Sequence, residues 1–165
     1  EDNKFACENI KKEAAKRNIE STRIIFAKEM NLQDHLARHK IADLFIDTFP
    51  YTAHTTCSDA LWSGLPVLTR MGQTFASRVA ASLLTSIGLK ELITNSKKEY
   101  VDLAVELANN PNKLNSIKEK LQKNIKNKPL YNTKLYTKNI ETAYKKVYEK
   151  YLAEQPADNI DINYP

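Results

Sequence analysis

Three short apolar blocks, each followed by a polar loop and a helical pattern, constrain the fold of this chain more than any other feature. The blocks lie at residues 23–26, 44–46 and 67–69. Apolar runs of this length are typical of strands that are covered on both faces. Their alternation with helices predicts the α/β class, with a short parallel sheet flanked by helices. Right-handed crossovers then bring the carboxyl ends of the strands to one edge of the sheet.

Local helix signals bound the other elements. Asn31 is a predicted N-cap, and Thr55 or Thr56 is predicted to cap a helix that Gly64 ends. The predicted helices span residues 8–17, 32–40, 55–63, 75–87, 98–108, 111–123 and 133–153, and residues 92–93 add a short strand. Residues 154–165 are polar and terminal, which predicts a flexible tail.

The length of 165 residues, of which 42% are hydrophobic, suits one globular domain followed by that tail. Because three or four strands are few for such a sheet and Glu1 is not an initiator Met, we expect further strands upstream in a longer protein. No apolar run approaches the ~20 residues that span a bilayer, so we expect no membrane segment. Cys7 and Cys57 are far apart and lack companion ligands, which favours reduced thiols in a cytoplasmic protein over a disulfide or a zinc site.

The loop after the second block carries the first candidate site. A helix is predicted to begin in this loop, at the ligand-binding edge of the sheet. Its start contains His54, Thr55 and Thr56, and Asp59 follows one helical turn later. Free backbone N–H groups and hydroxyls there suit a phosphate or diphosphate, and a carboxylate suits a ribose diol. The alternative is that Thr55 is only a helix cap and His54 only a loop residue.

A second candidate site lies on the helix after the first block. His35 and Arg38 are three positions apart, so they project from one face of that helix. An arginine with an imidazole beside the first strand suits contacts to a base edge or a ribose. The alternative is that both residues are simply solvated on an exposed face.

Several other classes of function are disfavoured. No G-x-S-x-G elbow, Walker sequence or dinucleotide fingerprint occurs, and the chain holds only 3 Gly. No pair of carboxylates for general acid and base catalysis is discernible, so the chain shows no base of its own.

The net charge of +5 arises mainly from lysines in the C-terminal third. Four tyrosines there have core-like helical spacing, namely Tyr136, Tyr144, Tyr148 and Tyr151. The lysines are therefore interpreted as a solvated face, and we expect neither nucleic-acid nor membrane binding. A non-catalytic module that binds an acidic partner through these lysines remains the alternative to an enzyme.

Together, a series of motifs resembles the C-terminal catalytic half of O-GlcNAc transferases over about residues 8–151. The matching segments are 23–26 (RIIF), His35 with Arg38, 41–43 (IAD), 46–48 (IDT), 54–56 (HTT), 59–67 (DALWSGLPV), 76–82 (ASRVAAS) and 129–134 (PLYNTK). Each motif alone is weak, but their combination is specific.

This resemblance implies a metal-independent, inverting protein glycosyltransferase of the GT-B architecture that uses a UDP-sugar and no cofactor. Residues 1–153 correspond to its Rossmann-like, nucleotide-sugar-binding half. In the family, the positions of His35 and Arg38 lie beside uracil and ribose, those of 54–56 hold the diphosphate, and that of Asp59 takes ribose hydroxyls. The general base and the acceptor site lie outside this half, and the family often adds tetratricopeptide repeats.

One departure from the family leaves the donor open. Leu32 stands where O-GlcNAc transferases have a lysine. The transferred sugar is therefore GlcNAc or a related hexose, and the acceptor is a Ser, Thr or Asn of a protein. Related branches transfer glucose to Asn or use GDP-fucose.

Overall fold

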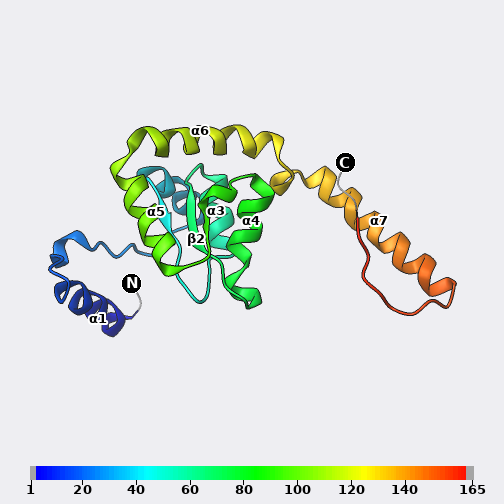
Figure 1. Ribbon diagram of the computed structural model, residues 1–165, viewed down its shortest axis with the longest axis horizontal. Coiled ribbons are helices and arrows are strands. Elements are labelled where there is room, and N and C mark those ends of the chain that lie inside the picture. The colour runs from blue at the N-terminus through cyan, green and yellow to red at the C-terminus, as the bar shows by residue number, and fades with distance from the viewer. Residues whose placement is uncertain (1–2, 163–165) are drawn as a thin grey trace. The chain divides into compact units, whose positions relative to one another are not determined.

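The computed structural model describes residues 3–162, and the chain divides into two compact units, Glu1–His39 and Lys40–Pro165. Figure 1 follows the chain through both units, each of which is described here by itself. The first contains α1 (Lys4–Ala15), a 3-10 turn (Ser21–Arg23) and α2 (Leu32–Arg38). A further 3-10 turn at His39–Ile41 leads into the second unit.

The cap of α2 confirms one local prediction. Asn31 Oδ1 accepts a hydrogen bond from the backbone N–H of Asp34 at 2.9 Å. The Asn31 side-chain amide also donates to the Asp34 carboxylate at 2.8 Å. These bonds satisfy one of the N–H groups that every helix start leaves without an intrahelical partner.

The strand predicted at residues 23–26 is wrong. Residues Ser21–Arg23 form a 3-10 turn instead, and Ile25 is 88% exposed. A strand needs a neighbour that pairs with its backbone N–H and C=O groups, and the described residues of the first unit contain no strand. Apolar character alone therefore did not make this segment a strand.

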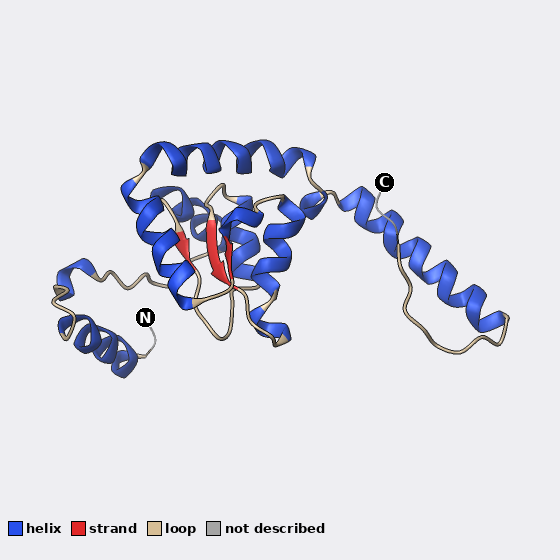
Figure 2. Cartoon of the chain, in the orientation of Figure 1, coloured by secondary structure: helices blue, strands red, loops and turns tan. Residues whose placement is uncertain are grey.

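The second unit contains the predicted parallel sheet, shown as arrows in Figure 2. Its strands are β1 (Phe45–Ile46), β2 (Val67–Arg70) and β3 (Ile93–Thr94), in the order β1-β2-β3. β1 pairs in parallel with Val67 and Leu68, and β3 pairs in parallel with Thr69 and Arg70. β1 and β3 thus pair with successive halves of β2, so β2 is the central strand of the sheet.

Helices follow the strands closely, as predicted. They are α3 (Thr55–Trp62), α4 (Val79–Ile87), α5 (Lys97–Asn109), α6 (Pro111–Asn127) and α7 (Thr133–Leu152), with 3-10 turns at Phe75–Ser77, Lys90–Leu92 and Pro129–Tyr131. Gly64 and Gly88 follow α3 and α4 with φ of +87° and +79°, in the left-handed region that favours glycine. The helix predicted at 75–87 is divided into a 3-10 turn at Phe75–Ser77, which opens with a capping box between Thr74 and Ser77, and α4, which begins at Val79.

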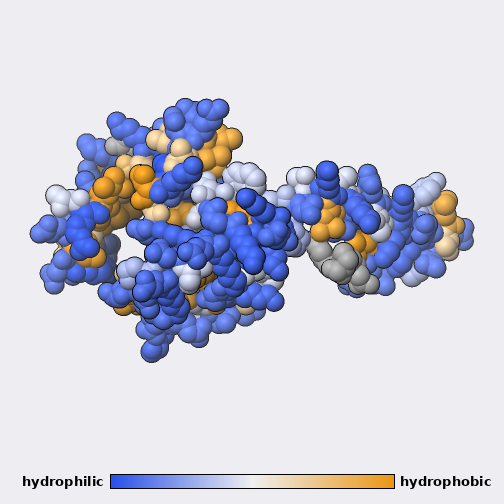
Figure 3. All heavy atoms as spheres, turned by 90° about the horizontal axis from the view of Figure 1, so that it is seen from above, coloured by the Kyte–Doolittle hydropathy of each residue, from blue (hydrophilic) through white to orange (hydrophobic). Residues whose placement is uncertain are grey.

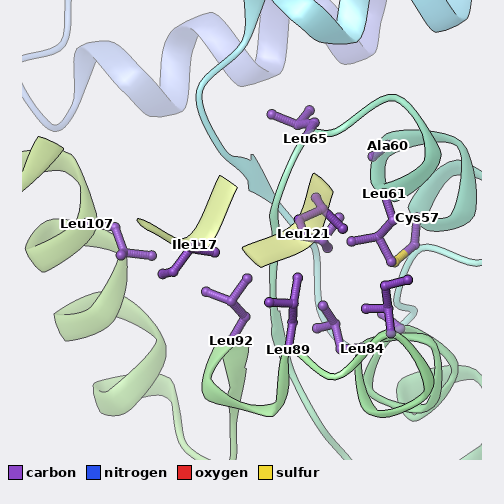
Figure 4. Packing of buried hydrophobic residues seen from close by; sticks show 13 residues of the cluster. Cys57, Ala60, Leu61, Leu65, Leu84, Leu89, Leu92, Leu107, Ile117 and Leu121 are labelled. Carbon is purple, nitrogen blue, oxygen red and sulfur yellow. The ribbon is translucent and has the colours of Figure 1, made fainter. Parts of the chain in front are cut away.

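The core of the second unit lies between the sheet and its helices. Figure 4 shows its side chains pointing toward one another from α3, α4, α6 and the turn before β3. The fully or nearly fully buried members include Leu61, Leu84, Leu89, Leu92, Leu107, Ile117 and Leu121. α6 contacts α3, α4 and α5, and the Asn124 amide donates to the Ile87 carbonyl at 2.8 Å inside this core.

The final helix differs from the prediction. No residue of α7 is buried, and Tyr136, Tyr144, Tyr148 and Tyr151 are 61–74% exposed rather than in a core. Figure 3 shows hydrophilic residues over much of the visible face, with smaller hydrophobic patches. No helix within residues 3–162 is long and apolar enough to cross a membrane.

Truncation of a core leucine tests this packing. We expect Leu121→Ala, at a fully buried position of α6, to lower the free energy of unfolding by about 3 kcal/mol because it leaves a cavity. Leu152→Ala, at a 63% exposed position of α7, is the matched control and should change it by less than about 0.5 kcal/mol. Equal effects in urea denaturation would contradict the described core.

Candidate functional site

The loop between β1 and α3 is organised by the buried carboxylate of Asp47, which is 6% exposed. One of its oxygens accepts hydrogen bonds from the backbone N–H groups of Thr48 and Ala53, at 2.9 and 2.8 Å. The other accepts from the hydroxyl of Thr69 on β2 at 2.6 Å. Asp47 therefore folds the loop back on itself and fastens it to the central strand.

Two further side chains hold the same loop. Thr52, 1% exposed, donates its hydroxyl to the Ala76 carbonyl at 2.6 Å, and its N–H donates to the same oxygen at 3.0 Å. Tyr100 of α5 donates its hydroxyl to the backbone carbonyl of Asp47. The loop is thus tied to the turn before α4 and to α5 as well as to β2.

The imidazole of His54 lies at the start of α3 and has a fixed orientation. His54 is the N-cap residue, but its side chain makes no capping bond. Its Nε2 lies 3.3 Å from the Ala76 carbonyl, and its ring stacks on Tyr51 with centroids 4.8 Å apart and meets Phe75 edge-on at 6.0 Å. Because a carbonyl oxygen can only accept, the proton of the neutral ring is on Nε2.

Thr55 and Thr56 are the first two residues of α3, and both are exposed. Neither hydroxyl has a hydrogen-bond partner within residues 3–162, and the first helical bond runs from Ser58 N–H to the His54 carbonyl at 3.1 Å. The N–H groups of Thr55, Thr56 and Cys57 thus have no acceptor in the described chain. The prediction that Thr55 or Thr56 caps this helix is therefore wrong, and so is the alternative that Thr55 is only a cap, because His54 is the N-cap residue.

These groups surround a hollow of about 420 Å³ at the carboxyl end of β1. Its lining consists of Phe45, Ile46, Asp47, Thr48, Tyr51, Thr52, Ala53, His54, Thr55 and Thr56. The carboxyl end of a parallel strand followed by a helix start is the usual place for a ligand in open α/β sheets. The hollow thus combines exposed donors with a loop that is firmly held.

Asp59 lies one turn beyond Thr55 on α3 and is half-buried. Its neighbour Ser58 accepts a hydrogen bond at its carbonyl from the hydroxyl of Tyr131, at 2.7 Å. Burial raises the pKa of Tyr131 to about 12, and the charge of Asp59 adds to this shift. Tyr131 thus fastens the segment after α6 to the helix that carries the candidate residues.

Cys57 is not suited to nucleophilic chemistry. Burial, with the nearby charge of Asp47 as a second cause, raises the pKa of its thiol to about 12. The thiol is therefore neutral near pH 7, whereas the thiolate is the nucleophile. Cys7 and Cys57 are both free thiols, and residues 3–162 hold no group of three or more His, Cys, Asp or Glu side chains placed to bind a metal ion.

His35 and Arg38 belong to the first unit, so the structure does not place them relative to the α3 turn. They are in direct contact, since Arg38 Nη2 lies 2.7 Å from His35 Nδ1. Arg38 Nη1 also donates to the Lys28 carbonyl at 2.9 Å. Both residues are half-buried, so they are not simply solvated on an exposed face.

Sequence reasoning missed the network that holds the loop. From the sequence, Asp47 was noted only within the segment 46–48 that resembles the family, and Thr69 and Tyr100 were not singled out. One signal could have revealed this network, namely an Asp directly after an apolar strand. A carboxylate at the end of a buried strand is itself buried, so it needs hydrogen-bond donors around it. Two of those donors are N–H groups of the same loop, but the third is the Thr69 hydroxyl of the neighbouring strand, which the local sequence does not specify.

Comparisons with known proteins agree with the fold. The profile described as Glycosyl transferase family 41 matches residues 4–140. The structure superimposes on a mutant of Thermobaculum terrenum O-GlcNAc transferase with a TM-score of 0.81 and 29% identity, over 87% of this chain and 28% of that one. The fold is thus the Rossmann-like half of a GT-B glycosyltransferase. The chain belongs to glycosyl transferase family 41.

Curated relatives are similar over most of this chain. It is 31% identical, over 156 residues, to the UDP-N-acetylglucosamine--peptide N-acetylglucosaminyltransferase of Caenorhabditis elegans, covering 94% of this chain and 14% of that protein. Over 150 residues it is 33% identical to the probable enzyme SEC of Arabidopsis thaliana, covering 90% and 15%. It therefore spans about one seventh of the length of these relatives.

The buried hydroxyl of Tyr131 predicts a pH dependence of stability. An unfolded tyrosine loses its proton near pH 10, whereas the folded Tyr131 keeps its proton up to about 12. The unfolded state then binds fewer protons, so the free energy of unfolding should fall as the pH rises from 10 to 12. In urea denaturation, Tyr131→Phe should make this fall shallower. Tyr144→Phe, at a 69% exposed position, should leave the slope unchanged, and equal slopes for both variants would contradict the assignment.

Proposed function

We propose that this chain supplies the nucleotide-sugar site of a protein glycosyltransferase that moves GlcNAc or a related hexose from a UDP-sugar to Ser, Thr or Asn. The observation that carries the proposal is the His54–Thr55–Thr56 turn, whose hydroxyls and N–H groups have no partner within residues 3–162. Membership of family 41 and relatives named as N-acetylglucosaminyltransferases support it.

The start of α3 suits the donor diphosphate. The N–H groups of residues 55–57 carry the positive end of the helix dipole, and the two threonine hydroxyls add neutral donors. Negative charge grows on the diphosphate as the glycosidic bond breaks. Donors already fixed toward that position stabilise the transition state more than the bound substrate.

His54 is a third donor in this proposal. Its Nε2 is engaged with the Ala76 carbonyl, so the other nitrogen, Nδ1, is the one that meets the leaving group. Nδ1 carries a hydrogen only when the ring is protonated. A bound diphosphate favours that charged form, since an opposite charge nearby stabilises imidazolium.

We assign the contacts to the base and the ribose of the nucleotide to His35, Arg38 and Asp59. Because a guanidinium can only donate, the bond from Arg38 assigns the proton of the neutral His35 ring to Nε2. That N–H is a donor of the kind that a uracil carbonyl accepts. The carboxylate of Asp59 suits the two hydroxyls of a ribose.

Other partners follow from the same proposal. The acceptor is a protein, and the general base and acceptor site come from outside these residues, together with the other catalytic half and the repeats often found in the family. Hydrogen bonds from helix N–H groups, hydroxyls and imidazole stabilise the charge of the diphosphate, so the proposal involves no metal or other cofactor. A cytoplasmic location suits two free thiols. Leu32 leaves the identity of the sugar open.

Replacement of both threonines tests the proposal directly. Thr55→Val with Thr56→Val keeps the β-branched shape and removes two exposed hydroxyls that have no partner in the described chain. We expect kcat of the full-length protein to fall on the order of tenfold to a thousandfold, while the melting temperature changes little.

The matched control is Thr142→Val on α7, whose hydroxyl donates to the Lys138 carbonyl at 2.7 Å. It should leave kcat unchanged. A double variant that melts earlier but keeps its kcat would refute the diphosphate role. Binding of UDP that disappears at raised salt and depends on the lysines instead would favour the acidic-partner alternative.

Arg38→Ala tests the base side of the proposed site. Loss of the guanidinium frees the His35 ring from its fixed tautomer, so we expect the Kd for UDP to rise about tenfold in calorimetry, or ~1.4 kcal/mol. Arg17→Ala, which removes an arginine paired with Glu13 at 2.7 Å, serves as the control. An unchanged Kd in Arg38→Ala would remove His35 and Arg38 from the site.

A further inference from the structure

Arg70 is a positively charged residue at the ligand-binding edge of the sheet that the proposed function does not use. It is the last residue of β2, the central strand, and follows Thr69, which bonds to Asp47. Successive side chains of a strand point to opposite faces, so Arg70 leaves the sheet on the face opposite Thr69. It pairs in register with Thr94 at the end of β3.

An aromatic ring from the site loop holds the guanidinium. The Cζ atom of Arg70 lies 4.2 Å from the ring centroid of Phe49, within the range of a cation–π contact. Phe49 in turn lies against Gly72, where an added Cβ would come within 2.9 Å of its Cε2. The bare backbone at Gly72 thus leaves room for the ring, and Phe49 belongs to the same loop as Tyr51 and His54.

The charge of Arg70 is not balanced within the described chain. Arg70 is half-buried and forms no ion pair within residues 3–162, and its Nε is buried without a hydrogen-bond partner. By contrast, Arg17 pairs with Glu13, and Arg78 donates to the Gly72 carbonyl at 3.1 Å. A partly desolvated cation without a counter-ion is costly, and a buried donor without a partner needs an explanation.

We propose that Arg70, held by Phe49, binds an anionic group of a substrate at the carboxyl edge of β2. The guanidinium presents a planar fork of donors that matches two oxygens of a phosphate or a carboxylate. The donor diphosphate and an acidic side chain of the protein acceptor both offer this chemistry. This inference rests on the proposed function, because it assumes that the edge of the sheet receives the substrates.

The test compares Arg70→Met with Arg70→Lys in the full-length protein. Methionine keeps an unbranched side chain but removes the charge, whereas lysine keeps the charge and loses the fork. Arg17→Met removes the same charge from a surface pair and is the matched control. Calorimetry gives the Kd for UDP and for uridine, and kinetics give KM for acceptor peptides with acidic or neutral flanks.

If the anion is the donor diphosphate, Arg70→Met raises the Kd for UDP about tenfold and leaves that for uridine unchanged, and Arg70→Lys recovers part of the loss. If it is an acceptor carboxylate, the Kd for UDP is unchanged and KM rises for the acidic peptide alone. Unchanged binding of both substrates, with a lower melting temperature, would overturn the proposal and leave Arg70 a packing residue. Failure of the wild-type protein to bind UDP would instead overturn the proposed function, and this inference with it.

Discussion

The three hydrogen bonds to the carboxylate of Asp47 are the constraint on which the site depends. They join the backbone of the loop after β1 to the hydroxyl of Thr69 on β2, inside the protein. A buried charge of this kind is tolerated only when its oxygens are satisfied, so the loop has few other conformations available. The start of α3 is held in place as well, because Ala53, one of the donors, directly precedes His54.

Rigidity of the loop matters because the proposed chemistry needs donors that are fixed before the reaction. Thr55 and Thr56 contribute nothing to their own helix cap, and the His54 ring is oriented by Tyr51, Phe75 and the Ala76 carbonyl. The loop is therefore held in place by its contacts with the rest of the unit, while Thr55 and Thr56 stay exposed. The buried polar groups of the loop thus have hydrogen-bond partners, whereas the N–H groups and threonine hydroxyls at the start of α3 have none within residues 3–162. This combination suits a preorganised binding site.

Predictions from the sequence succeeded where the signals were local. Gly64 ended α3, and short apolar blocks gave β1 and β2 in parallel pairing. They failed where the conformation or burial of a segment depends on a partner distant in sequence. Examples are the unpaired segment 23–26 and the exposed tyrosines of α7. The support of the site was missed for the same reason. Thr69, one of the three donors to the Asp47 carboxylate, lies 22 residues away, and Tyr100, which donates to the Asp47 carbonyl, lies 53 residues away.

The central claim is that the N–H groups at the start of α3 receive the diphosphate of a nucleotide. It is tested most directly by nuclear magnetic resonance of the ¹⁵N-labelled full-length protein during titration with UDP and, separately, with uridine. The largest shifts with UDP should fall on the backbone amides of Thr55, Thr56 and Cys57, and uridine should leave these amides unchanged. Shifts confined to the lysine-rich helices α6 and α7, with residues 55–57 unmoved, would contradict the claim.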